Sequence, residues 1–81
     1  MEHIPAFSSE AKNFQHGRYR HYKGGEYQTH FIARSSETLE EMIVYQDLHE
    51  PEKVWCRPLK LFLESVNVNG SVIPRFSKMN S

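Results

Sequence analysis

The sequence predicts an all-β domain, a small and strongly bent antiparallel barrel of five to six short strands with one 3₁₀ turn. The chain has 81 residues, which is enough for one domain with a single compact core. Short strand-like runs are separated by turn sequences, among them Gly24-Gly25 and Asn69-Gly70. No stretch repeats apolar residues at the 3.6-residue spacing of a long amphipathic helix.

The first predicted feature is a flexible N-terminal arm over residues 1–13. This segment follows neither the strand period nor the helix period, and Pro5 interrupts it. Strand-like sequence begins at Gly17, where "RYRHY" and "YQTHFIA" flank the turn sequence "KGGE". We therefore expect a β-hairpin directly after the arm, with Phe7 or Phe14 holding the arm against the core.

The loop length of this hairpin decides which side chains face the core, because a shift of one residue exchanges the two faces of a strand. A two-residue loop at Gly24-Gly25 would turn two arginines inward. A three-residue loop, Gly24 to Glu26, instead turns Tyr19 and His21 inward. Burying an unpaired arginine costs several kcal/mol, on the order of magnitude usual for an ion, so we predict the three-residue loop.

The middle of the chain predicts two more strands. "SSETLEE" matches a helix capping box through Thr38 and Glu41, which indicates a turn with room for one helical turn. The apolar runs "MIVYQDL" and "VWCR" suit strands, and "HEPEK" suits the loop between them. Pro58 ends the second strand, and "PLKLF" predicts the 3₁₀ turn.

The last part of the chain predicts a second hairpin. "LESVNV" and "SVIPRF" flank Asn69-Gly70, the residue pair that favours a type I′ turn. The globular domain is predicted to span residues 14–78, with residues 79–81 frayed at the C-terminus. Alternation along the strands predicts a core made of these residues: Tyr19, Tyr27, Phe31, Val44, Val66 and Val72.

Composition and charge narrow the class of protein. The hydrophobic content of 38% and the charged content of 25% are ordinary for a globular domain. Cys56 is the single cysteine and excludes a disulfide framework, so we expect it to be a small buried residue in a reducing compartment. No apolar run approaches the length of a membrane span, and the N-terminus lacks the pattern of a signal peptide, so a cytoplasmic location is expected.

The net charge is zero, but the charges are unevenly distributed. Residues 35–53 contain one basic and six acidic residues, and the rest of the chain contains nine basic and four acidic residues. A neutral total gives little of the long-range attraction that nonspecific nucleic-acid binding requires. We interpret the acidic segment as a solvated loop rather than a site for a basic partner.

Five motifs occur in an order that resembles a known bacterial family. They are "GRYRHYKGGEY", "ARSSETLEE", "IVYQDL", "VWCRPLKLFLE" and "VIPRF". Together they resemble the family named domain of unknown function 1653, over about residues 17–76. The chain departs from the family pattern at Ser35, where the family often has histidine, and at Cys56, where it usually has an aliphatic residue. The resemblance implies a compact SH3-like barrel or roll and no established activity.

The same resemblance implies which positions to examine for binding. They are His21, Tyr22, Lys23, Ser36, Glu37, Tyr45, Trp55, Arg57 and Arg75. Aromatic residues and arginine are the types that dominate binding interfaces. For Trp55, packing in the core is an equally good interpretation. For Arg57 and Arg75, an ion pair with an acidic residue of the chain is the favoured role.

Metal binding and catalysis are not favoured by the residue patterns. None of the five histidines and Cys56 shows the spacing of a converging metal site, and no cofactor is expected. A serine in "SSET" typically caps a turn rather than acting as a nucleophile. An acid-base pair of His21 and Glu37 is the remaining enzymatic alternative, but a barrel this small is filled by its own side chains.

The sequence thus predicts a monomeric binding module rather than an enzyme. We expect Tyr22, Lys23, Tyr45 and Arg57 to line a shallow groove that takes a peptide or protein partner. RNA or a nucleotide-type ligand, stacked beside arginine and lysine, is the alternative.

Overall fold

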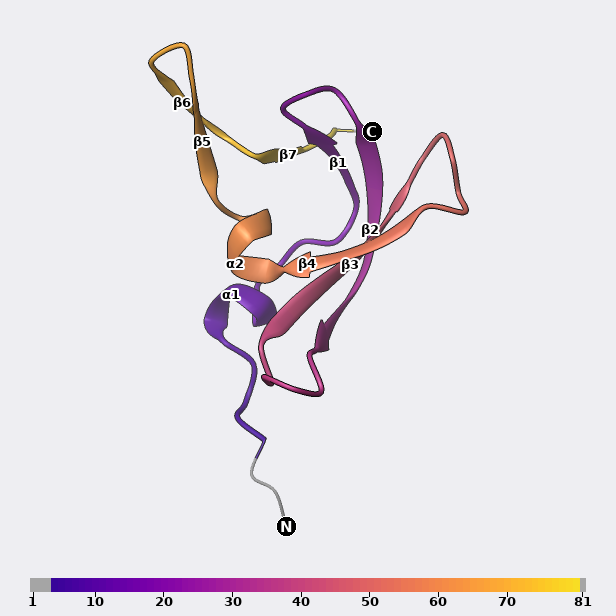
Figure 1. The fold of residues 1–81 in the computed structure, drawn as a ribbon, viewed down its shortest axis with the longest axis vertical. Coiled ribbons are helices and arrows are strands. Elements are labelled where there is room, and N and C mark those ends of the chain that lie inside the picture. The colour runs from indigo at the N-terminus through magenta and orange to yellow at the C-terminus, as the bar shows by residue number, and fades with distance from the viewer. Residues whose placement is uncertain (1–3, 81) are drawn as a thin grey trace.

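A curled, five-stranded antiparallel sheet forms the main body of the protein, in a computed structural model that describes residues 4–80. The strand order is β4-β3-β2-β1-β7, and β5 and β6 form a separate two-stranded sheet (Figure 1). The strands of the main sheet are β1 (Arg18–His21), β2 (Glu26–Arg34), β3 (Glu41–Asp47), β4 (Val54–Pro58) and β7 (Phe76–Lys78).

The predicted mainly-β, antiparallel class is confirmed, with seven strands instead of five or six. The prediction of a closed barrel is wrong. Within residues 4–80, β4 and β7 each pair with one strand only, so the main sheet keeps two open edges. Two short helices, α1 (Ser9–Lys12) and α2 (Leu59–Phe62), lie next to each other beside the sheet (Figure 1). Neither helix is long and apolar enough to span a bilayer.

The hydrophobic core lies between one face of the main sheet and the two helices. Phe62 of α2 is 1% exposed and stacks on Phe76 of β7, with 4.0 Å between ring centroids. The buried cluster consists of these residues: Ala11, Tyr19, Ile43, Tyr45, Leu59, Phe62 and Phe76. Phe14, at the end of the N-terminal segment, packs against it through Tyr19 and Phe62.

The predicted core is confirmed in part. Tyr19 is buried, and Tyr27 packs against the buried cluster. The prediction that Phe31 and Val72 lie in the core is wrong, because their exposed fractions are 58% and 71%. Val44 and Val66 are half-buried and lie outside the cluster.

A β-bulge in β2 explains why Phe31 is exposed. Thr29 pairs with Tyr45 and Phe31 pairs with Val44, so His30 is an extra residue without a partner in β3. One extra residue exchanges the faces of the strand beyond it. Thr29 therefore faces the core before the bulge, whereas Phe31 faces the opposite, convex side after it.

The first hairpin has the predicted faces and loop length, but the loop lies two residues earlier in the chain. Tyr19 pairs with Tyr27, and the His21 N–H donates to the Gly25 carbonyl at 2.7 Å, so the three loop residues are Tyr22 to Gly24 instead of Gly24 to Glu26. The observed register differs from the predicted one by an even number of residues, so the same side chains face the core. Arg20 stays exposed and pairs with Glu26 at 2.6 Å.

The described part of the predicted flexible arm is attached to the sheet. Ser8 caps α1 by accepting a hydrogen bond from the Ala11 N–H at 3.1 Å. The Ser8 backbone N–H and hydroxyl both donate to the Glu41 carboxylate at 2.6 Å. The predicted capping box with Thr38 does not form, because Glu41 is engaged by the N-terminal segment. Predictions for residues 1–3 and 81 lie outside the described residues.

The second half of the chain follows the predicted order with two differences. The turn after Pro58 is the single α-helical turn α2 rather than a 3₁₀ turn, and it buries Leu59 and Phe62 on one side. The hairpin of β5 (Ser65–Val68) and β6 (Ser71–Pro74) turns at Asn69 and Gly70, both with positive φ, as a type I′ turn requires. The end of the predicted last strand separates as β7 and pairs with β1.

Candidate functional site

A groove of about 500 Å³ opens on the core side of the main sheet, beyond the buried cluster. We call it the aromatic-basic groove. It is lined by His21, Lys23, Gly25, Tyr27, Tyr45, Trp55, Cys56, Arg57, Pro58 and Phe76. These residues come from β1, the following loop, and strands β2, β3, β4 and β7.

Strand pairing places the side chains of β4 in the groove. Trp55 lies opposite Tyr45, and Arg57 lies opposite Ile43. Directly opposite residues of an antiparallel pair share a face, so Trp55 and Arg57 point to the same side as the buried Ile43. Trp55 sits at the rim and is 48% exposed, so its role is to line the groove rather than to fill the core.

The Arg57 guanidinium is held over the floor of the groove. Its Nε donates to the hydroxyl of Tyr45 at 3.2 Å, and the guanidinium lies 5.7 Å from the ring centroid of Phe76. An arginine over an aromatic face gains a cation–π attraction. Because one of its N–H groups binds a neutral hydroxyl, the charge of Arg57 is fixed in place without being neutralised.

His21 lies at the other wall of the groove. It pairs with Phe76 across β1 and β7, and its ring meets the Phe76 ring edge-on with 4.9 Å between centroids. Its Nδ1 accepts a hydrogen bond from the Lys23 backbone N–H at 3.1 Å, so the neutral ring carries its proton on Nε2. The sequence favours a buried histidine bonded to a backbone carbonyl, whereas in the structure His21 is half-buried and a backbone N–H donates to its ring.

The charged side chains that line the groove, Lys23 and Arg57, are both basic. Burial lowers the pKa of His21 below its usual value, and the charges of Arg57, Arg75 and Lys23 lower it further. Among the residues that the structure describes, no aspartate or glutamate lines the groove. Neither Lys23 nor Arg57 forms an ion pair within residues 4–80.

The ion-pair prediction is confirmed for Arg75 and wrong for Arg57. The Arg75 guanidinium lies 3.6 Å from the Glu64 carboxylate, beside the groove. Arg57 binds the Tyr45 hydroxyl instead and forms no ion pair with an acidic side chain among residues 4–80. The backbone carbonyl of Arg75 accepts from the Tyr22 N–H at 2.9 Å, which fixes the loop after β1.

The structure brings together most of the residues singled out in the sequence. Five of them line the groove: His21, Lys23, Tyr45, Trp55 and Arg57. Tyr22 lies beside it, with its ring 4.6 Å from that of His21, and Arg75 also lies beside it. Ser36 and Glu37 are elsewhere, in the turn at the far end of β2, where the Ser36 hydroxyl donates to Glu37 at 2.7 Å. An acid-base pair of His21 and Glu37 is therefore not assembled.

Phe76, Tyr27 and Cys56 are groove residues that the sequence reasoning did not assign to the site. Phe76 lies in the motif "VIPRF", directly after Arg75, so its position next to a predicted site residue was the available signal. Cys56 is exposed, and the prediction that it is buried is wrong. It lies between Trp55 and Arg57 in β4, so its side chain points to the opposite face of the sheet from theirs, and Cys56 lines the groove through its backbone.

The comparisons with known proteins agree with this fold. Residues 17–78 match the family model described as "Protein of unknown function (DUF1653)". The chain belongs to this family. A crystal structure of a family member from Bordetella bronchiseptica is similar, with 34% sequence identity and a TM-score of 0.77, covering 85% of this chain and 91% of that chain. No curated protein matches the chain.

The family match includes the whole of the aromatic-basic groove. The groove residues run from His21 to Phe76, inside the matched range of 17–78. The resemblance stated from the five motifs is thereby confirmed. The helix α1 lies wholly outside the matched range. The hydrogen bonds between Ser8 and Glu41 lie partly outside it, because Ser8 precedes residue 17.

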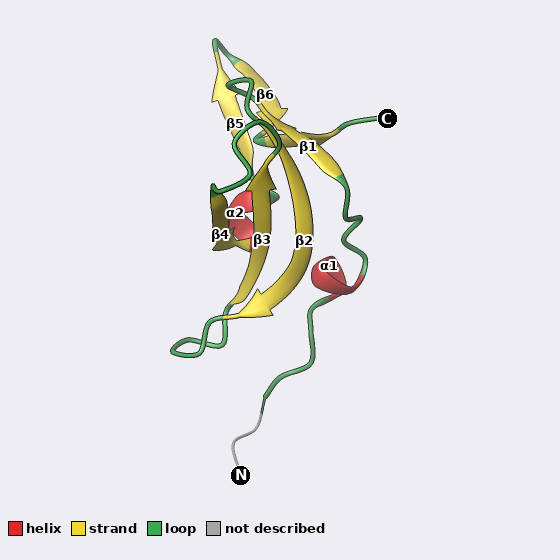
Figure 2. Cartoon of the chain, turned by 90° about the vertical axis from the view of Figure 1, so that its right-hand side faces the viewer, coloured by secondary structure: helices red, strands yellow, loops and turns green. Residues whose placement is uncertain are grey.

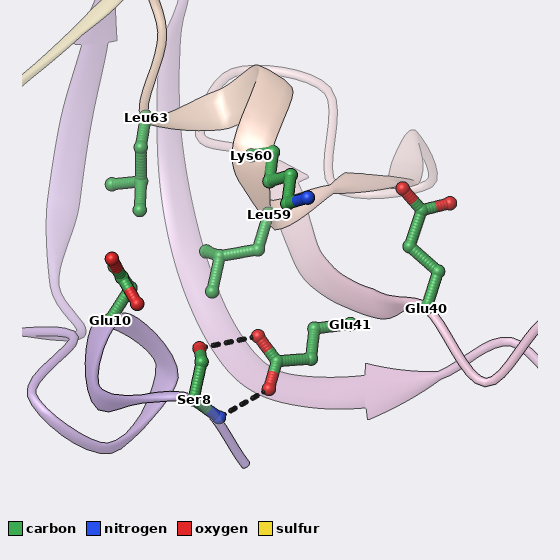
Figure 3. A pocket seen from close by; sticks show the side chains of 7 residues that line it. All are labelled: Ser8, Glu10, Glu40, Glu41, Leu59, Lys60 and Leu63. Atoms are coloured by element: carbon green, nitrogen blue, oxygen red, sulfur yellow. Dashed lines mark hydrogen bonds between the residues drawn. The ribbon is translucent and has the colours of Figure 1, made fainter. Parts of the chain in front are cut away.

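A second cavity, of about 310 Å³, lies between the N-terminal segment and α2. It is lined by Ser8, Glu10, Glu40, Glu41, Leu59, Lys60 and Leu63, and Figure 3 shows Leu59 and Leu63 pointing toward Ser8 and Glu10. The hydrogen bonds from Ser8 lower the pKa of Glu41, so this carboxylate is charged and already bound. The cavity lies between two segments of the chain, and two of its polar residues, Ser8 and Glu41, bind each other.

Metal-ligating side chains do not gather at either place. Among residues 4–80, no three histidine, cysteine, aspartate or glutamate side chains are close enough to hold a metal ion. His16 binds the hydroxyl of the buried Thr29 at 3.1 Å, and His30 binds the side chain of Gln46 at 2.8 Å. His49 contacts Glu26 at 3.2 Å. The histidines are thus distributed among separate contacts.

Proposed function

We propose that this protein is a non-catalytic binding module that takes an acidic peptide segment of a partner protein in the aromatic-basic groove. One observation carries the proposal. The groove places the charges of Lys23 and Arg57 among the rings of Tyr27, Tyr45 and Trp55, with no carboxylate lining it.

The chemistry of the lining suits such a ligand. Aromatic rings supply flat apolar contact area at low entropic cost, and arginine binds carboxylates through charge-assisted hydrogen bonds. The Arg57 guanidinium is already held by Tyr45, so less side-chain freedom is lost when a carboxylate binds. The lining comes from five strands and one loop, which suits an extended segment rather than an enclosed small molecule.

The distribution of basic residues favours a peptide over a nucleic acid. Arg18 and Arg20 alternate with Tyr19 and His21 along β1, so they point to the opposite face of the sheet from the groove. The basic residues are therefore divided between two faces, and the net charge of the chain is zero. Nucleic-acid binding depends on a continuous basic surface and on long-range attraction to phosphates.

The groove also lacks the partners that acid-base catalysis would need. The Nδ1 of His21 is engaged by a backbone N–H, and the charges that surround this ring are positive. A general base is typically oriented by a carboxylate or a carbonyl group. We therefore assign His21 to ligand contact and electrostatics.

An NMR titration tests this function with three probes of defined chemistry. They are a capped hexapeptide of alternating glutamate and valine, its counterpart with lysine in place of glutamate, and hexauridylate. We expect the acidic peptide to shift the Trp55 indole signal and the amide signals of His21 and Gly25. The lysine peptide should leave these signals unchanged, and binding of the acidic peptide should weaken as salt is added.

Two matched charge deletions locate the binding site. Arg57→Gln should weaken acidic-peptide binding by about tenfold to a hundredfold, because a charge-assisted hydrogen bond contributes on the order of 1.5–3 kcal/mol. Arg18→Gln removes the same charge from the opposite face and should change affinity by less than about twofold. Equal effects of the two substitutions, shifts caused only by hexauridylate, or no shifts with any probe at millimolar concentration would each overturn the proposal.

A further inference from the structure

The strand β4 is an open edge of the main sheet and also forms one wall of the aromatic-basic groove. It pairs with β3 on one side and with no strand on the other within residues 4–80. Figure 2 shows β4 at the margin of the sheet, beside α2. Its residues Val54, Trp55 and Cys56 are all exposed.

Hydrogen-bond alternation determines which backbone groups of β4 are free. The N–H of Asp47 donates to the carbonyl of Lys53 at 3.0 Å, and this pair is in register with the β3–β4 pairing. In an antiparallel ladder, hydrogen-bonded and non-bonded pairs alternate. Trp55 and Arg57 therefore direct their backbone groups toward β3, whereas Val54 and Cys56 direct theirs away from the sheet.

We propose that the acidic peptide binds as an added β-strand along the open edge of β4, through the backbone groups of Val54 and Cys56. This inference rests on the proposed function, since it specifies how the same peptide lies. Extended peptides commonly join an exposed sheet edge in this way, with affinity from the main chain and specificity from alternate side chains.

The basic side chains of the groove and the open edge of β4 both suit an extended acidic peptide. Trp55 and Arg57 alternate with Val54 and Cys56, so the strand that offers free backbone groups also presents an aromatic ring and a cation toward the groove. Every second side chain of an added strand would face that side. A segment with acidic residues at alternate positions meets Arg57 and Lys23 there, where no carboxylate of the groove lining competes.

Two of the devices that prevent strand addition, a central proline and a bulge, do not occur in β4, and its inward-pointing charge, Arg57, is the group that would bind the peptide. Proteins protect open edges with proline, inward-pointing charges or bulges. In β4 the proline is Pro58, at the end of the strand, and the pairing from Val54 to Pro58 has no register shift. The free part of the edge is short, which suits a brief peptide segment and not a continuous sheet between copies.

Backbone methylation of the probe tests the added strand. Two versions of the capped hexapeptide of alternating glutamate and valine are compared, one N-methylated at its second and fourth residues and one at its third and fifth. Alternate amides of an added strand face β4, so one version should bind about tenfold more weakly than the unmethylated peptide, and the other within about twofold of it. Equal affinities of both versions would overturn strand addition while leaving the groove as a binding site. Absence of binding by the unmethylated peptide would instead overturn the proposed function.

A substitution in β4 gives a second, independent test. Cys56→Pro removes an N–H that does not serve the β3–β4 ladder, and proline is tolerated on edge strands. We expect Cys56→Pro to lower peptide affinity by about tenfold, and the matched Cys56→Ala to leave it unchanged within about twofold. In the wild-type protein, peptide binding should also slow hydrogen exchange of the Val54 and Cys56 amides but not that of the Trp55 amide, which is already bonded. Unchanged exchange at Val54 and Cys56 in the peptide-saturated protein would contradict the proposal, even if Cys56→Pro fails to fold.

Discussion

At the scale of single residues, the pKa of His21 responds to the charges that surround its ring. Its ring packs against Phe76 and Tyr22, and the charged groups that affect it come from three separate segments. Lys23 lies in the loop after β1, Arg57 in β4, and Arg75 between β6 and β7. All three are positive, so the free groove resists one more positive charge at His21.

An acidic ligand should reverse this effect, which gives a pH-dependent affinity. Carboxylates in the groove favour protonated His21, so the pKa of His21 is higher in the complex than in the free protein, where it is lowered. The complex then holds more protons, and by linkage its affinity rises as pH falls. We expect binding of the glutamate-valine hexapeptide to tighten between about pH 7.5 and pH 5.5, a range in which glutamate stays ionised.

Isothermal titration calorimetry in buffers of different ionisation enthalpy measures the proton uptake directly. His21→Gln should remove most of the pH dependence. His49→Gln is the matched control, because His49 is exposed and contacts Glu26 on the side away from the groove. An unchanged pH profile in His21→Gln would show that another group titrates.

Residue type was sufficient to predict several groove residues. It was not sufficient to predict which face of the sheet the adjacent residues in the sequence occupy. Trp55, Arg57 and Tyr45 were predicted from residue type and motif, and all three line the groove. The exposed position of Cys56 was not predicted, because an apolar neighbourhood in sequence suggests burial. Its position follows from the pairing of Trp55 with Tyr45, which is a contact between strands that the sequence does not display.

At the scale of elements, strands and turns were predictable and the bulge was not. Asn69-Gly70 specifies its type I′ turn locally, because few other residue pairs accept positive φ at both positions. The extra residue His30 continues the alternation of "YQTHFIA" without any interruption in the sequence. A bulge is decided by how β2 meets β3, so the face of Phe31 could not be derived from β2 alone.

The N-terminal segment provides a prediction at this scale. Ser8 caps α1 and also donates two hydrogen bonds to Glu41, so it joins the helix to β3. Ser8→Ala removes the cap and the hydroxyl contact and should lower the free energy of unfolding by about 1–2 kcal/mol. Chemical denaturation followed by circular dichroism measures the change.

Ser9→Ala is the matched control for the hydrogen bonds made by Ser8. The Ser9 hydroxyl contacts only the exposed Glu10 side chain, at 3.4 Å, so its loss should change stability by less than about 0.5 kcal/mol. If Ser8→Ala were as mild as Ser9→Ala, the N-terminal segment would not be held as the structure shows.

At the scale of the whole molecule, an open sheet replaces the barrel that the sequence predicted. The number of short strands and tight turns is compatible with either architecture, because closure depends on strand tilt and stagger. Here β5 and β6 leave the main sheet and form their own hairpin (Figure 1). Phe62 of α2 fills the space that a closing strand would have covered, with its ring close to those of Tyr19, Tyr45 and Phe76.

This arrangement makes Phe62 the side chain on which the stability of the whole domain depends most. Removing a buried phenylalanine side chain costs about 3–5 kcal/mol, a large part of the 5–15 kcal/mol typical of a small domain. We expect Phe62→Ala to lose about that much in urea denaturation. Leu61→Ala in the same helix turn should lose less than about 1 kcal/mol, because Leu61 is 42% exposed.

Since Phe62 stacks on Phe76 beneath the aromatic-basic groove, the milder Phe62→Leu should keep the fold and still weaken peptide binding. Equal losses of stability in Phe62→Ala and Leu61→Ala would mean that α2 does not close the open side of the sheet.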